Sequence, residues 1–147
     1  MKTVEQLLTI KGSTVWTIDV NATVFDALKI LAEKEIGALA VMEDGQLAGI
    51  VSERDYARKV DLKGATSRTT LVKDIMTRKV LYVRPDQTVE ECMALMTEKR
   101  IRHIPVLREA EMVGIISIGD VVKELLSEQG FLIRQLENYI TGFHGPA

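Results

Sequence analysis

The pattern Gly-Ile-x-Ser-x-x-Asp occurs twice in this sequence, as GIVSERD at Gly49–Asp55 and as GIISIGD at Gly114–Asp120. A buried strand would need only the apolar positions, so the Ser and the Asp call for an explanation. One explanation is structural, because Ser is a preferred N-cap and Asp favours the positive end of a helix. The other is a ligand site, because free N–H groups can bind an anion and a carboxylate can accept both hydroxyls of a ribose. Both explanations stay open at this point.

Other residues offer little chemistry. His103 has no Ser or Cys nucleophile at a telling spacing, and the single cysteine, Cys92, falls on the apolar stripe of an expected helix. The motifs GxGxxG, GxxxxGK[ST] and HExxH are absent from the sequence. A basic face interleaved with aromatic residues, typical of nucleic-acid binding, is also absent. We therefore expect no catalysis, no required metal and no nucleic-acid partner.

Composition is that of a globular protein. The chain has 147 residues, 46% of them hydrophobic and 27% charged, with a net charge of −2. This length suits one or two small domains, and the charge gives no field that would attract nucleic acid or an anionic membrane. The N-terminal stretch MKTVEQLLTIKG lacks the apolar run of a signal peptide, and no stretch is long enough to span a bilayer. These observations predict a cytoplasmic protein with no membrane partner.

The two copies of the pattern belong to a longer internal repeat. Residues 15–57 align with residues 80–122 without a gap and are identical at 11 of 43 positions. With three residues inserted, the match extends upstream, where VEQLLT at 4–9 faces VKDIMT at 72–77. A duplicated unit is thus the main organisational feature of the chain.

Each unit has the same expected order of elements, β-α-β-β-α. A short strand (15–18 or 80–83) precedes a helix that Thr23 or Thr88 should cap, followed by two strands and a second helix. The amphipathic segment FLIRQLENYI after Gly130 is predicted to form a final helix outside the repeat. We place the first unit with an N-terminal helix at 1–60, a linker at 61–70, the second unit at 71–129, and a C-terminal helix and tail at 130–147.

These repeats resemble a tandem pair of CBS (cystathionine β-synthase) domains. The resemblance rests on GIVSERDYARKV in the first copy, and on VKDIMTRKVLYVRPDQTVEECMALMTEKRIRHIPVL and GIISIGDVVKEL in the second. It implies a mixed α/β (α+β) fold with two β-α-β-β-α repeats packed about a pseudo-twofold axis, plus N-terminal and C-terminal helices. It is similar in particular to small bacterial CBS-pair signal-transduction proteins.

The resemblance also implies a function. CBS pairs bind AMP, ADP, ATP, S-adenosylmethionine or NAD/NADH in a cleft between the copies, with no metal required. In the family the Asp of the repeated pattern binds the ribose hydroxyls, the Ser or Thr lies near the ribose or phosphate, and we expect the Gly to let its strand lie close to the base. The residues expected in nucleotide binding are Ser117, Asp120, His103, Arg102, Ile104, Pro105, Val80, Tyr82, Ser52, Arg54, Asp55, Trp16, Ala38 and Leu39.

The two copies differ where ligand contacts are expected. The second copy has Arg102 and His103 where the first has Gly37 and Ala38, so we expect an adenylate to bind first beside Asp120. The function expected is a regulatory nucleotide sensor that signals to an unknown protein partner. A structural protein with degenerate sites is the alternative. The apolar content of the second helices and of FLIRQLENYI predicts a homodimer.

Overall fold

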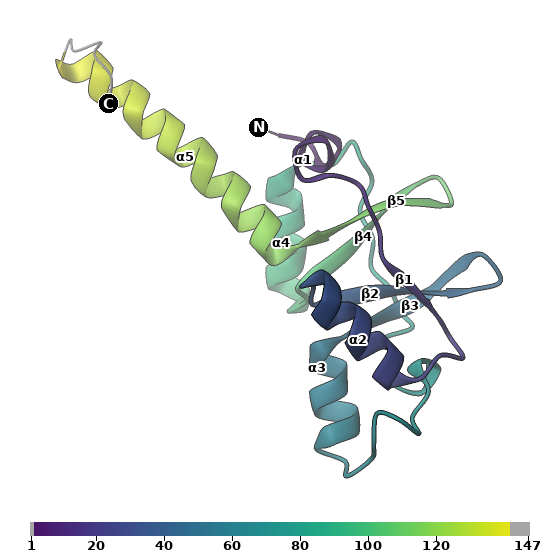
Figure 1. Ribbon diagram of the computed structural model, residues 1–147. Coiled ribbons are helices and arrows are strands. Elements are labelled where there is room, and N and C mark those ends of the chain that lie inside the picture. Colours follow the sequence, from purple (N-terminus) through teal and green to yellow (C-terminus); the bar gives the residue numbers. More distant parts are fainter. Residues whose placement is uncertain (1, 142–147) are drawn as a thin grey trace.

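The computed structural model describes residues 2–141, so part of the predicted C-terminal tail lies outside the described residues. The first repeat contains β1 (Thr17–Asp19), α2 (Val24–Lys34), β2 (Ala38–Glu43), β3 (Gln46–Ser52) and α3 (Glu53–Tyr56), which continues as a π-helical turn, Ala57–Asp61. The second contains α4 (Val89–Lys99), β4 (His103–Arg108), β5 (Glu111–Ser117) and α5 (Ile118–Thr141). A helix α1 (Val4–Lys11) precedes the first repeat, and a 3-10 turn, Val72–Asp74, precedes the second. The predicted mixed α/β pair of repeats is confirmed (Figure 1).

Local sequence signals explain these elements. Thr23 caps α2 by accepting from the Asp26 N–H at 3.1 Å, and Thr88 caps α4 by accepting from the Glu91 N–H at 3.1 Å, as predicted. The β2–β3 hairpin turns on Asp44 and Gly45, both with positive φ, as a two-residue turn of type I′ requires.

The two sheets differ at one edge. In the first, β1 pairs in parallel with β2, which pairs antiparallel with β3. In the second, the strand predicted at 80–83 is absent, and one parallel bridge joins Val83 to Val106. Pro105 explains the loss: its carbonyl accepts from the Val83 N–H at 3.1 Å and the Leu107 N–H donates to Val83 O at 3.0 Å, but proline has no N–H with which to extend this ladder back to residue 81.

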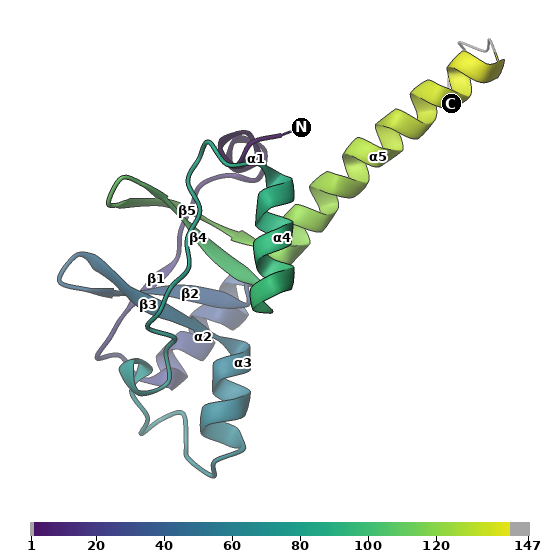
Figure 2. The same ribbon diagram turned by 180° about the vertical axis from the view of Figure 1, so that it is seen from behind.

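The leading segments are exchanged between the repeats. Val4, Leu7 and Leu8 of α1 lie in the core of the second repeat, whereas Val72, Ile75 and Met76 lie in the core of the first. Matched backbone bonds hold both segments: the Val4 N–H donates to Gln87 O at 2.8 Å, and the Val72 N–H donates to Ala22 O at 2.9 Å. Figure 2 shows α1 beside α4. The grouping by packing therefore differs from the predicted grouping of α1 with the first unit.

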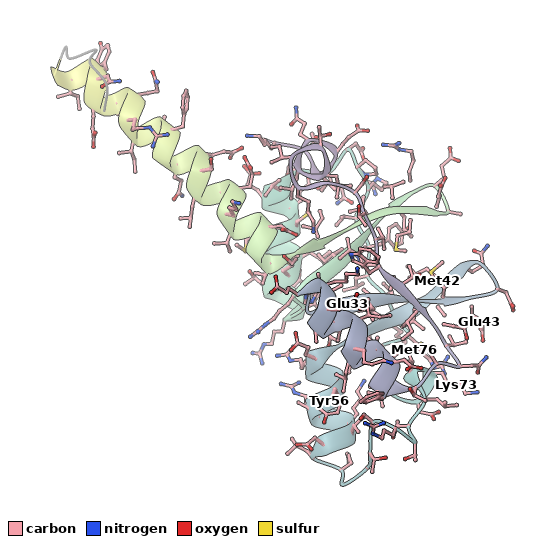
Figure 3. The ribbon with its side chains drawn as sticks, in the orientation of Figure 1. Glu33, Met42, Glu43, Tyr56, Lys73 and Met76 are labelled. Atoms are coloured by element: carbon pink, nitrogen blue, oxygen red, sulfur yellow. The ribbon has the colours of Figure 1, made fainter. Side chains whose placement is uncertain are left out.

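The helix α5 is longer than the sequence suggests. The second helix of the repeat and the segment FLIRQLENYI were expected as separate helices, but α5 runs through Gly130 without a break. A glycine costs a helix about 1 kcal/mol and, unlike proline, removes no hydrogen bond. The outer half of α5 extends away from the rest of the chain, and its side chains stand clear of the body (Figures 1 and 3).

Cys92 is a core residue, as predicted. Its side chain is fully buried in the second cluster, and burial raises the pKa of its thiol to about 11. A thiol with this pKa stays protonated at neutral pH and is a poor nucleophile.

Candidate functional site

Each repeated pattern forms a strand-to-helix junction closed by reciprocal hydrogen bonds. At the first junction the Asp55 N–H donates to Ser52 Oγ at 3.3 Å, and the Ser52 N–H donates to Asp55 Oδ2 at 3.0 Å. At the second, the Asp120 N–H donates to Ser117 Oγ at 3.1 Å, and the Ser117 N–H donates to Asp120 Oδ2 at 2.8 Å. These are capping boxes, with Asp in the place of the usual Glu or Gln. Helix capping therefore accounts for the Asp as well as for the Ser.

The glycine of each pattern leaves room for the leading segment that packs against its repeat. A Cβ on Gly49 would lie 2.6 Å from the backbone oxygen of Thr77, and a Cβ on Gly114 would lie 2.7 Å from Leu8 Cδ2. The space beside each glycine is therefore filled by the exchanged segment, and the expected close approach to a base is replaced by a close approach to protein.

Two cavities lie beside these junctions, each of about 410 Å³. The Asp55 cavity is lined by Gly37, Ile50, Ser52, Glu53, Arg54, Asp55, Thr77, Lys79, Val80, Leu81, Ile101, Arg102 and His103. The Asp120 cavity is lined by Lys11, Thr14, Val15, Trp16, Glu35, Ile36, Gly37, Ala38, His103, Ile115, Ser117 and Asp120. Each cavity takes residues from both repeats, and its volume is in the range of small-molecule sites.

The structure regroups the residues expected to bind a nucleotide. Arg102 lines the Asp55 cavity and not the Asp120 cavity, while His103 lines both. The structure therefore groups Arg102 with Asp55, whereas the prediction grouped it with Asp120. The predicted residues on the Asp55 cavity are Ser52, Arg54, Asp55, Val80, Arg102 and His103, and those on the Asp120 cavity are Trp16, Ala38, His103, Ser117 and Asp120.

Four expected residues line neither cavity. Leu39 and Ile104 are fully buried in the two cores, and Pro105 is buried in the strand β4. Tyr82 is 53% exposed and lies outside both linings. Burial in the cores therefore removes Leu39 and Ile104 from any contact with a ligand in either cavity.

The two Asp carboxylates have different cationic partners. Asp55 Oδ1 lies 3.0 Å from Lys59 Nζ, one turn further along the same helical segment. Asp120 Oδ2 lies 2.6 Å from Lys11 Nζ at the end of α1, and the same ammonium donates to Ile115 O at 2.7 Å. The Asp120 junction is thus tied to the exchanged helix, whereas the Asp55 pair is local.

Burial and neighbouring charges shift two pKa values at the Asp120 cavity. Burial lowers the pKa of His103 and so does the nearby Lys11 ammonium, against the opposing effect of Asp120. Burial alone would raise the pKa of Asp120, but hydrogen bonds from Lys11 and Ser117 outweigh it, and the net pKa lies below the usual value. At neutral pH the cavity therefore holds a neutral imidazole and an ionised carboxylate.

Sequence reasoning missed the two lysines. Lys11 and Lys79 each line one cavity, two residues beyond the matched segments 4–9 and 72–77. The upstream alignment pairs these lysines and could have pointed to them. The sequence could not show which cavity each lysine lines, because that depends on the exchange of the leading segments between the repeats.

Two kinds of site are not found among the described residues, a metal site and a membrane-spanning helix. Within residues 2–141, no group of three His, Cys, Asp or Glu side chains is placed to hold a metal ion. None of the helices described there combines the length and apolar character needed to cross a membrane.

Two α/β repeats of matching element order, the second without its first strand, with a cavity at each strand-to-helix junction, define a class of two-repeat module. The chain belongs to the CBS domain family, whose profile matches residues 9–61 and 72–127. It is 43% identical to the mitochondrial CBS domain-containing protein CBSX3 of Arabidopsis thaliana over 136 residues, covering 89% of this chain. The match spans 66% of that protein's length.

Solved structures share the fold. A candidate signal-transduction protein with CBS domains from Burkholderia ambifaria MC40-6 is 52% identical, with a TM-score of 0.84 over 87% of this chain and 96% of its own. The CBS pair of protein MJ0100, solved in complex with 5′-methylthioadenosine and S-adenosyl-L-methionine, is 24% identical, with a TM-score of 0.77 over 87% of this chain and 98% of its own. At that identity the likeness supports the fold alone.

Proposed function

We propose that this CBS pair is a regulatory module that binds an adenine ligand, AMP, ADP, ATP or NAD(H), and reports its level to a protein partner. The observation that carries the proposal is that each repeated Asp lies on the wall of a cavity large enough for an adenosine moiety. The MJ0100 pair, which has the same fold, was solved with adenosine-containing ligands. The proposed module performs no catalytic step, and its location in the cytoplasm stays a prediction.

The cavities suggest how binding could become a signal. Ser52 and Asp55 come from the first repeat, whereas Arg102 and His103 on the same cavity come from the second. A ligand held by both walls favours the arrangement of the repeats in which both walls can reach it. Binding would therefore shift the population between arrangements by its difference in affinity for them.

A second candidate function is supported by the capping boxes. Both Asp residues have a structural role without any ligand, as a dimerising or docking protein with degenerate sites would require. Substitution of both Asp residues by Asn separates the two functions. The Asn side-chain oxygen can still accept the capping N–H, but its NH₂ group cannot accept a ribose hydroxyl.

The test is isothermal titration of wild type and of Asp55→Asn/Asp120→Asn with AMP, ADP, ATP, NAD and NADH. We expect at least one ligand to bind wild type and to bind the variant about ten- to a hundredfold more weakly, because a charge-assisted contact is lost. Thermal unfolding serves as the control for the caps. Equal affinity in a variant of unchanged stability would make the two Asp residues helix caps alone. No binding of any ligand at millimolar concentration would favour the interaction-protein alternative.

We further propose that the protein forms a homodimer through the exposed face of α5. Apolar residues recur there in alternating steps of four and three residues, which is the spacing of a coiled-coil seam. The seam consists of Val122, Leu126, Gln129, Ile133, Leu136 and Ile140, and each of its apolar members is at least 37% exposed.

The occupant of this seam that fits best is the α5 of a second copy, lying antiparallel. In that arrangement Leu126 packs against the partner's Leu136, and Val122 packs against the partner's Ile140, so the seam complements itself about a twofold axis. Lys123 and the partner's Glu137 flank the seam with opposite charges. This self-complementarity favours a second copy over a different protein as the partner of α5.

A further inference from the structure

The repeats provide an internal comparison between the two cavities. Arg54 of the Asp55 cavity has Gly119 as its counterpart in the other repeat, and Arg102 has Gly37. Glu35 lines the Asp120 cavity, and its counterpart is Arg100, whose carbonyl accepts from Arg54 at 3.1 Å. At each of these matched positions, the basic residue either lines the Asp55 cavity, as Arg54 and Arg102 do, or is bonded to a residue of its lining, as Arg100 is.

Each cavity also has one lysine at a matched position of the repeat, and the two lysines have different partners. Lys11 is held by Asp120 at 2.6 Å, so its charge is neutralised within the cavity. Its counterpart Lys79 forms no ion pair within residues 2–141, because Asp55 is paired with Lys59. The second repeat has Glu124 in the place of Lys59, and Glu124 pairs with Lys2 at 2.7 Å. The pairing on each helix thus decides which of the two lysines stays available.

The linings consequently carry opposite formal charge. The Asp55 cavity has three permanent cations, Arg54, Lys79 and Arg102, against the carboxylates of Glu53 and Asp55. The Asp120 cavity has one cation, Lys11, against the carboxylates of Glu35 and Asp120. Arginine side chains are suited to phosphate because they present several donors in a fixed fork, and they stay charged at all relevant pH values.

We propose that the two cavities take different adenine ligands: the Asp55 cavity a phosphate-bearing nucleotide, and the Asp120 cavity an adenosine-type ligand without phosphate. This inference rests on the proposed function, and it reverses the order of binding expected from the sequence. In the Asp55 cavity, the phosphate would meet Arg54 and Arg102 from opposite repeats. In the Asp120 cavity, two carboxylates would repel a phosphate, and Lys11 is already paired.

The single tryptophan allows the two cavities to be observed separately. Trp16 lines the Asp120 cavity, is 41% exposed and lies outside the lining of the Asp55 cavity. Its fluorescence should respond to a ligand in the Asp120 cavity, whereas titration heat reports binding at either cavity. We expect adenosine to change Trp16 fluorescence at the concentrations at which it binds, and AMP to release its first binding heat at concentrations that leave Trp16 unchanged.

Matched variants test the role of charge. Arg54→Met should weaken the first AMP binding event about ten- to a hundredfold and leave adenosine binding unchanged. Arg58→Met removes the same charge from an exposed position of the same helical segment outside both linings, and should change neither. Gly119→Arg should instead create an AMP response at Trp16, since a Cβ there meets only Ser117 Oγ, at an ordinary 3.6 Å.

The outcomes separate this inference from the proposed function. If AMP and adenosine both perturb Trp16 with equal affinity, or if Arg54→Met and Arg58→Met behave alike, the charge partition is wrong while nucleotide binding stands. If no adenine ligand gives heat or a fluorescence change at millimolar concentration, the proposed function itself fails. If AMP releases binding heat without changing Trp16 fluorescence, and if this heat is lost in Arg54→Met, the result supports both the charge partition and the proposed function.

Discussion

Ser52 and Asp55 each satisfy a backbone N–H of the other, and Ser117 and Asp120 do the same. A capping box uses one oxygen of the carboxylate, so capping and ligand binding are compatible in one residue. At the Asp55 junction the second oxygen faces Lys59, and a diol would have to share or displace that ammonium. The two explanations offered by the sequence are thus not exclusive at the level of single atoms.

The two glycines of the repeated pattern should tolerate alanine differently. In Gly49→Ala the new Cβ meets the Thr77 backbone oxygen, which cannot move without shifting the strand, so we expect a loss of about 1–3 kcal/mol in unfolding free energy. In Gly114→Ala the new Cβ meets the end of the Leu8 side chain, which can rotate, and the loss should be smaller. Urea unfolding of both variants measures the difference, and an equal or reversed order would contradict this account of the glycines.

His103 should make stability depend on pH. Because burial and Lys11 lower its pKa in the folded protein, the unfolded chain binds the proton more readily, and protonation favours unfolding. This destabilising effect of His103 is absent above the unfolded-state pKa of about 6.5, and it increases as the pH falls below that value. Urea unfolding between about pH 7.5 and about pH 5.5 should therefore show a steeper loss of stability in wild type than in His103→Gln. Parallel curves for the two proteins would assign the pH dependence to other groups.

At the scale of elements, the exchanged segments couple the repeats. The helix α1 packs in the core of the second repeat, and residues 72–76 pack in the core of the first. The core of each repeat is therefore completed by a segment that precedes the other repeat in the sequence. Met76, labelled in Figure 3, is one of the buried residues supplied in this way. The exchange also builds both cavities, because the segments after α1 and after residue 76 cross from one repeat to the other.

The packing of α1 predicts a contrast between two leucine-sized residues of the same helix. Leu7 is 3% exposed in the second core and Ile10 is 63% exposed. Leu7→Ala should therefore cost about 2–5 kcal/mol of unfolding free energy, whereas Ile10→Ala should stay within about 0.5 kcal/mol of wild type. Chemical denaturation followed by circular dichroism measures both. A small effect of Leu7→Ala would mean that α1 is not part of the folded core in solution.

At the scale of the whole molecule, the projecting α5 dominates the shape (Figure 1). Its apolar seam is exposed in a single copy of the chain, and contiguous exposed apolar area of this kind marks an interaction surface. A dimer formed through α5 would leave both cavities outside the α5 contact. Ligand binding and assembly should therefore be separable by mutation.

The dimer is tested by one substitution on the seam and one beside it. Leu136→Glu places a charge against the partner's Leu126 and should convert the protein to a monomer, as measured by light scattering at micromolar concentration. Gln135→Glu adds the same charge next to the seam and should leave the mass unchanged. A wild-type mass equal to one chain, or dimers that persist in Leu136→Glu, would exclude α5 as the interface.

The sequence by itself determined the repeat, the caps at Thr23 and Thr88 and most of the order of elements, because these depend on periodicity and on bonds between residues a few positions apart. The strand expected at 80–83 and the break expected at Gly130 are the exceptions. It also pointed to both Ser/Asp pairs, whose hydrogen bonds span three residues. It could not show that α1 packs with the second repeat, since the apolar stripe of an isolated helix fits either core. That exchange placed Lys11 on Asp120, whereas the packing of the two repeats placed Arg102 on the Asp55 cavity and left the predicted Tyr82 outside both cavities. Contacts between residues distant in the chain depend on how the two repeats pack, and only the tertiary structure decided them.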